Sequence, residues 1–224
     1  MLKFYYHPLS PIARRVWIAL LEKDIPFEPV VVDLRGEQMK PEFLAINPFH
    51  RVPVITDGQT RVIESLAILD YLEARYPTPS LRPSEAEAIA KMRMVQMVVT
   101  NELTTKFPTI VLAQTESEYA AAAEQCRTAW QFLDRQLGDC EYFGGATIDL
   151  ADIVAGTTVR LGVRLGLSVA SQPNVDRWQQ RLAARSAWQA CAPSDNDLAT
   201  WRRWVKLRIQ RHQQRQRRQL GRAS

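Results

Sequence analysis

Cysteine is scarce in this sequence, and its placement excludes several kinds of chemistry. The 224 residues contain three cysteines, Cys126, Cys140 and Cys191, whose spacing matches no metal-binding motif. Complete disulfide pairing would leave one of the three over, which favours a reducing compartment. Because all three follow residue 125, we expect neither a metal site nor a catalytic protein thiol in the first half of the chain.

Long apolar runs are also missing. No stretch approaches the ~18 apolar residues that a membrane span needs, and the segment from Lys3 to Pro8 is typical of a strand rather than of a leader peptide. Apolar residues make up 46% of the chain, an ordinary share for a globular protein. We therefore expect a cytoplasmic protein with no membrane contact, built as one large domain or two modest ones.

Acidic residues are absent from the C-terminal end. None follows Asp197, whereas nine Arg and Lys residues follow Trp201, and subtracting those nine charges from the net +5 leaves −4 for the rest. An apolar face within residues 201–209 predicts that a helix continues to about Arg211. Beyond it the composition is typical of a solvated or disordered segment. Nucleic-acid binding is the alternative, and the lack of aromatic residues after Trp204 argues against it.

The first 76 residues alternate between predicted strands and predicted helices. Strands are expected at 2–6, 27–32, 52–56 and 60–63, and helices at 11–23, 36–46 and 65–76. The apolar character of residues 27–32 favours a strand buried on both faces. Asp57-Gly58-Gln59 predicts a hairpin between the last two strands. This order of elements predicts an α/β domain with a thioredoxin-like fold.

A proline-rich stretch from Tyr76 to Pro83 divides this part from a segment that is helical throughout. Helices are expected at 85–112, 116–137 and 149–165, and again from residues 172 and 193. Asp149 should cap the third of them, with Asp152 three residues later. We therefore expect a domain at 1–76, a linker at 77–84, an all-helical domain at 85–205 and a basic tail at 206–224.

Two short motifs in the first domain predict a binding site for a peptide. The proline of Val52-Pro53 has no N–H to donate, so this pair can leave the main-chain groups of Val52 free for an extended ligand. Glu64-Ser65 stands at the start of a predicted helix, where it can hold an amino group and a carboxylate together. A thiol peptide with an amino-acid head, such as glutathione, has both groups. The alternatives are a trans proline at a strand edge and a serine that merely caps its helix.

Taken in order, the motifs resemble those of a known family. They are a Ser-Pro at the first helix, the Val-Pro, the Glu-Ser, a proline-rich linker and a capped all-helical second domain. Up to about residue 205 the chain resembles the cytosolic glutathione S-transferases, in particular bacterial-type members with a serine in the site. The resemblance implies a homodimer that joins glutathione, as co-substrate, to small electrophiles. A non-catalytic binding or scaffold protein, or a glutathione-dependent isomerase or peroxidase, is the alternative.

The resemblance also implies a role for individual residues. Ser10 should stabilise the thiolate, with Tyr5 or Tyr6 as rivals that lie within the predicted strand. Thiol-exchange members have a cysteine in place of Ser10, so conjugation is favoured here. A cis Val52-Pro53 bond should aim the main chain of Val52 at the ligand. The remaining expected contacts to glutathione are Arg51, Pro53, Glu64 and Ser65.

The walls of the electrophile pocket and the dimer contact are expected with less support from the sequence. Leu9, Asn101, Phe107 and Trp201 are the proposed walls, and ordinary core packing is the alternative for each. Phe49 is the expected contact to the partner subunit. His50 stands where many members of the family have glycine, and Asp149 stands where they have serine or threonine.

Overall fold

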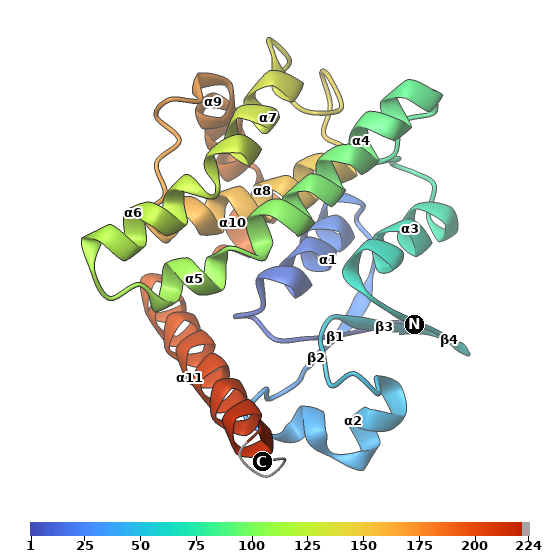
Figure 1. The fold of residues 1–224 in the computed structure, drawn as a ribbon. Coiled ribbons are helices and arrows are strands. Elements are labelled where there is room, and N and C mark those ends of the chain that lie inside the picture. Colours follow the sequence, from blue (N-terminus) through green and yellow to red (C-terminus); the bar gives the residue numbers. More distant parts are fainter. Residues whose placement is uncertain (221–224) are drawn as a thin grey trace.

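The first third of the chain forms a four-stranded mixed sheet in the computed structural model, which describes the backbone of residues 1–220 and the side chains of residues 1–211 (Figure 1). The strands lie in the order β2-β1-β3-β4. β1 and β2 are parallel, and the other neighbours are antiparallel. Their bounds are β1 (Leu2–Tyr6), β2 (Phe27–Val31), β3 (Val54–Asp57) and β4 (Thr60–Ile63).

Helices cover both faces of this sheet (Figure 1). α1 (Pro11–Glu22) and α3 (Ser65–Arg75) pack on the face that carries the buried side chains of Phe4 and Ile55. The 3-10 turn η1 (Glu37–Met39) leads into α2 (Pro41–Ile46), which covers the opposite face through Phe43. This arrangement confirms the thioredoxin-like fold of the N-terminal part.

The prediction that residues 27–32 form a strand buried on both faces is wrong. β2 lies at the edge of the sheet, none of its residues is buried, and Val31 is 54% exposed. Pro29 explains the edge position, because a proline cannot donate a hydrogen bond to a second neighbouring strand.

From Ala86 to Leu220 the named elements are all helices, which confirms the all-α second part. Two expected helices, 85–112 and 116–137, are each divided in the structure. Pro108 lies in the first turn of α5, where its missing N–H costs no helical hydrogen bond. The division at residues 125–126 contains no helix-breaking residue, and α10 was not expected. The bounds are α4 (Ala86–Val98), η2 (Val99–Thr104), α5 (Phe107–Leu112), α6 (Glu116–Glu124), α7 (Arg127–Leu137), α8 (Leu150–Arg164), α9 (Pro173–Ala184), α10 (Ser186–Ala190) and α11 (Asp195–Leu220).

α8 is the central helix, and its first ten residues are all buried although one of them, Asp152, is charged. The Asp152 carboxylate accepts hydrogen bonds from the Asp149 N–H at 2.9 Å and from Trp178 Nε1 at 2.7 Å. Asp149 caps the helix as expected, accepting from the N–H groups of Ala151 and Asp152. At Gly156 an added Cβ would lie 2.4 Å from the Trp188 ring, so only glycine allows this close packing.

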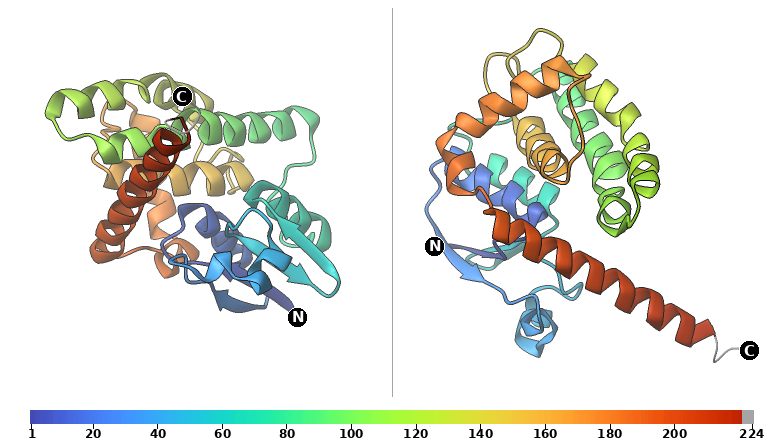
Figure 2. Two further views of the ribbon diagram at one scale, coloured as in Figure 1. Left: turned by 60° about the horizontal axis from the view of Figure 1, so that its bottom comes forward. Right: turned by 90° about the vertical axis from the view of Figure 1, so that its left-hand side faces the viewer.

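α11 is longer than the sequence predicts. It continues to Leu220, whereas a helical end near Arg211 was expected. Arg and Gln are good helix formers, and neither Gly nor Pro occurs in this stretch before Gly221, so nothing in the local sequence stops the helix. Its C-terminal half extends away from the rest of the chain (Figure 2). Within residues 1–220, no helix combines the length and apolarity needed to cross a bilayer.

Polar contacts join the sheet domain to the helical part. Arg15 of α1 is 1% exposed and donates to the hydroxyls of Thr100 and Thr104 in η2 and of Thr158 in α8. At the end of α1, Glu22 forms a two-pronged ion pair with Arg185 at 2.7 and 2.8 Å. These bonds fix α1 against the second domain, and α1 carries Ser10 at its N-terminus.

Candidate functional site

The strand register brings the three expected binding segments together at one end of the strands, which we call the sheet edge. Val54 of β3 pairs with Tyr5 of β1 on one side and with Ile63 of β4 on the other. The loop that follows β1, the residues that precede β3 and the residues that follow β4 therefore emerge together. Ser10, Val52-Pro53 and Glu64-Ser65 belong to these three segments, although they are separated in sequence.

Ser10 is the N-cap of α1. Its Oγ accepts a hydrogen bond from the Ala13 N–H at 3.2 Å, and its main-chain N–H donates to His7 O at 2.9 Å. Since the hydroxyl oxygen serves as an acceptor, the Ser10 O–H remains available as a donor. It lies at the positive end of the helix dipole, which favours an anion nearby.

The two rival tyrosines pack on opposite faces of the sheet. Tyr6 is buried, stacks on Phe4 with ring centroids 4.7 Å apart and meets Trp17 edge to face at 5.0 Å. Burial raises the pKa of Tyr6. Tyr5 lies on the other face against Phe43. Both side chains are therefore engaged in packing, which supports Ser10 as the thiolate donor.

Asn47 fixes the conformation of the segment before β3 through side-chain hydrogen bonds. The Val52-Pro53 peptide bond is cis, and within residues 1–211 neither main-chain group of Val52 has a hydrogen-bond partner. Asn47, which is 3% exposed, donates through Nδ2 to Arg51 O at 2.7 Å and accepts from the Phe49 N–H at 2.9 Å. The sequence interpretation assigned no role to Asn47, although an Asn-Pro pair is a turn signal.

Glu64 and Ser65 form the start of α3. Glu64 is exposed and has φ +69°, a left-handed conformation that is unusual for this residue type and recurs at functional sites. Ser65 is 5% exposed. No side chain caps this helix, whereas Ser10 caps α1 and Asp149 caps α8. The N-terminus of α3 is therefore open to an external carboxylate.

The backbone conformation at His50 shows why glycine is common at this position in the family that the chain resembles. Its φ is +55°, the region where glycine carries no steric penalty, so a glycine at this position suits the turn. His50 is exposed, as is Arg51 beside it.

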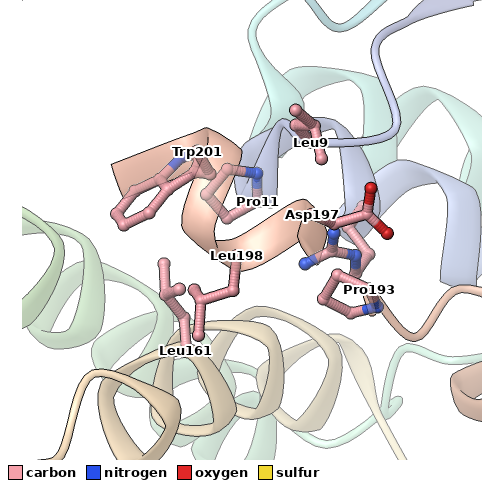
Figure 3. A pocket seen from close by; sticks show the side chains of 8 residues that line it. Leu9, Pro11, Leu161, Pro193, Asp197, Leu198 and Trp201 are labelled. Carbon is pink, nitrogen blue, oxygen red and sulfur yellow. The ribbon is translucent and has the colours of Figure 1, made fainter. Parts of the chain in front are cut away.

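A small cleft lies between α1, α8 and α11, and its lining includes Leu9 and Pro11, the neighbours of Ser10 in the sequence (Figure 3). It contains two of the four expected walls, Leu9 and Trp201, and also Arg14 of α1, which the sequence interpretation did not single out. Phe107 is instead 3% exposed in the core, and Asn101 is exposed on η2. The remaining lining residues are Pro11, Leu161, Pro193, Asp197 and Leu198.

The final helix reaches the loop that carries Ser10. The rings of Trp204 in α11 and His7 lie with centroids 4.8 Å apart. His7 Nδ1 accepts from the Leu9 N–H at 3.1 Å, which requires the neutral imidazole with its proton on Nε2. Burial lowers the pKa of His7, which favours this neutral form. Among the described residues, no three His, Cys, Asp or Glu side chains are placed together to hold a metal ion.

Family models match most of the chain. The glutathione S-transferase N-terminal domain matches residues 4–80, and the C-terminal domain of the same family matches residues 88–186. Glutathione S-transferase 3 of Zea mays is 32% identical over 84% of this chain and 91% of its own length. Glutathione S-transferase theta-1 of Homo sapiens is 31% identical, with 82% of each chain covered.

Solved structures give the same result. A glutathione transferase homologue from Sulfitobacter with bound glutathione is 28% identical, with a TM-score of 0.73 over 85% of this chain and 96% of its own. Maleyl pyruvate isomerase, a bacterial zeta-class member, is 25% identical, with a TM-score of 0.74 over 85% of this chain and 96% of its own.

Proposed function

This chain belongs to the glutathione S-transferase family of enzymes, and we propose that it conjugates the glutathione thiolate to small electrophiles at the sheet edge where Ser10, Val52 and Ser65 emerge. Residues 1–76 bind glutathione in this proposal. The electrophile occupies the cleft at their boundary with the helical residues 85–205. The observation that carries the proposal is a capped α1 whose Ser10 hydroxyl remains free to donate.

Glutathione is held through its main chain and its two ends. The unpartnered N–H and C=O of Val52 pair with the cysteinyl residue of the tripeptide, as an added strand would. The uncapped N-terminus of α3 and the Ser65 hydroxyl bind the α-carboxylate, and Glu64 accepts from the α-ammonium group. Arg51 binds the glycine carboxylate, with Asn47 fixing the loop.

The thiolate needs only modest stabilisation. A free thiol has a pKa near ~8.5, so half ionisation at pH 7 requires a shift of ~1.5 units, or ~2 kcal/mol. A hydrogen bond to a charged acceptor contributes ~1.5–3 kcal/mol. The Ser10 hydroxyl, at the positive end of α1, supplies one such bond. A serine-type site therefore suffices without a tyrosine or a cysteine.

The same site also suits a glutathione-dependent isomerase. One structural relative is an isomerase, and that chemistry needs a bound thiolate next to an electrophile pocket as well. Conjugation is the proposal because it requires nothing beyond the thiolate and the cleft. A purely non-catalytic scaffold would not need the open α3 N-terminus or the free Ser10 donor.

We also propose a homodimer in which Phe49 contacts the partner subunit. Phe49 is 58% exposed on the loop that Asn47 braces. Met94 and Met97 on α4 are exposed as well, at 42% and 49%. Exposed apolar side chains of this size mark interaction sites, and a loop aromatic on one subunit with an apolar helix face on the other is a complementary pair.

The test has two steps. Calorimetry at neutral pH with millimolar reduced glutathione should register heat, and retention on immobilised glutathione should follow. Conjugation of 1-chloro-2,4-dinitrobenzene should then exceed the uncatalysed rate. Binding without turnover would favour the scaffold function, whereas the absence of both binding and protection from melting would remove the proposal.

A further inference from the structure

Arg14 is the one strongly basic side chain among otherwise mostly apolar lining residues of the cleft. Leu9, Pro11 and Trp201 line the same cleft (Figure 3), and Ser10 lies between the first two in the sequence. The enclosed part of the cleft measures only about 10 Å³, so an electrophile lies across its open mouth, where it meets one guanidinium group beside apolar side chains.

The Arg14 guanidinium is only partly satisfied within the protein. Nη2 donates to Pro8 O at 2.9 Å, while the buried Nε has no hydrogen-bond partner. Among the side chains that the structure describes, no carboxylate lies within ion-pair distance of Arg14. By contrast, Arg164 pairs with Asp195 at 2.7 Å and Arg185 pairs with Glu22. Arg14 is thus a partly exposed cation whose buried Nε lacks a hydrogen-bond partner and whose charge lacks an anionic partner.

The charges around Arg14 leave it cationic. Burial lowers the pKa of Arg14 to about 10, with Arg164 and Arg160 adding repulsion, so it stays protonated at neutral pH. Asp197 is the acidic residue of the cleft, but its carboxylate accepts from both the N–H and the hydroxyl of Ser194 at 2.8 Å. Its charge weakens the field of Arg14 without providing an ion pair.

We propose, resting on the conjugating function above, that the preferred electrophiles of this enzyme carry a carboxylate, which Arg14 binds. Arg14 follows Ser10 by one helical turn, since its N–H donates to Ser10 O at 3.1 Å. One turn rises about 5.4 Å. A small ring can therefore place its reacting carbon near the sulfur held at Ser10 and its carboxylate near Arg14.

A matched pair of substrates tests the assignment. In 4-chloro-3,5-dinitrobenzoate and 4-chloro-3,5-dinitrobenzamide the same ring carbon is attacked. The sulfur forms the new C–S bond, the C–Cl bond breaks, chloride leaves with the bonding pair and the thiol proton goes to solvent. Only the first substrate is anionic. Each kcat/KM is divided by the uncatalysed rate constant of its own substrate, so intrinsic reactivity cancels.

The wild-type enzyme should prefer the carboxylate by about tenfold, the discrimination that one charge-assisted hydrogen bond gives. Arg14→Met should lower the carboxylate-to-amide ratio by about tenfold. Asp197→Asn, which keeps an acceptor for Ser194, should raise it by about threefold because a repelling charge is removed. Arg177→Met is the charge-matched control on α9, where Arg177 donates to Asn174, and it should leave the ratio unchanged.

The outcomes separate the two proposals. Conjugation of the amide with no preference for the carboxylate, or an unchanged ratio in both Arg14→Met and Asp197→Asn, would overturn the role of Arg14 alone. If Arg14→Met fails to fold, the wild-type ratio and Asp197→Asn still decide. Failure to conjugate either substrate, together with no retention on immobilised glutathione, would overturn the conjugating function and the substrate class with it.

Discussion

Replacing Ser10 by alanine removes two interactions that can be measured separately. The first is the cap on α1, where Oγ accepts from the Ala13 N–H at 3.2 Å. Losing a hydroxyl cap costs ~1 kcal/mol, which in a chain of this size lowers Tm by about 2–4 °C. The second is the proposed donor to the glutathione sulfur. Losing ~1.5–3 kcal/mol there raises the pKa of the bound thiol by about 1–2 units.

Thr115→Ala is the matched control for the first effect. Thr115 caps α6 in the same way, with its Oγ1 accepting from the Glu118 N–H at 3.2 Å. It lies in the helical part, away from the sheet edge. Thr115→Ala should therefore reproduce the loss of stability and leave the thiol untouched. Ser10→Thr keeps both the cap and the donor, so it should retain most of the activity.

The assay is the pH dependence of thiolate absorbance in the glutathione complex, read beside kcat/KM for a model electrophile. At neutral pH, Ser10→Ala should lose about 10- to 100-fold in kcat/KM, in proportion to the lost thiolate fraction. The loss should diminish as the pH rises above the new pKa. Full activity with an unshifted thiol pKa would refute the role of Ser10 and direct attention to Tyr5, Tyr6 or a main-chain N–H.

Three further predictions concern stability, the turn before β3 and assembly. Burial and the neighbouring Asp152 raise the pKa of Asp149 to about 7, above its ordinary ~3.9. The contribution of Asp149 to the free energy of unfolding is therefore greatest below about pH 4 and is lost as the pH rises through 7. Because asparagine cannot titrate, the urea midpoint of Asp149→Asn should vary less with pH across that range than the midpoint of the wild type. His50→Gly should gain about 1 kcal/mol by relieving the φ of +55°, seen as a higher Tm, and a raised KM for glutathione would show instead that the imidazole touches the ligand. Phe49→Asp should shift sedimentation equilibrium toward monomer, and a dimer of unchanged affinity would contradict its assigned place.

Local rules were enough to predict most of the elements and the caps. Pro11 after Ser10 fixes the start of α1, and Asp149 with Asp152 fixes the start of α8, because each signal acts within four residues. The hairpin at Gly58 follows from the same kind of rule, and its φ of +58° is the conformation that glycine supplies. The order of these elements then led to the correct fold class.

Long-range placement could not be predicted in the same way. Arg14 and Arg15 look alike in sequence, two charges on one helix, yet Arg14 borders the cleft and Arg15 is 1% exposed. What separates them is the packing of α8 and η2, whose contacting threonines lie 85 to 143 residues further along the chain. The edge position of β2 likewise depends on which strands pair, and an apolar run alone does not determine that.

Arg15 also limits how this protein can be recombined with its relatives. Its guanidinium is shared among hydroxyls supplied by Thr100, Thr104 and Thr158. A chimera that joins residues 1–80 to the helical half of a relative without equivalent hydroxyls would leave the Arg15 guanidinium buried without hydrogen-bond acceptors. This would lower the free energy of unfolding by several kcal/mol. Exchange of the two halves should therefore succeed only when the arginine and its three threonines are transferred as a single unit.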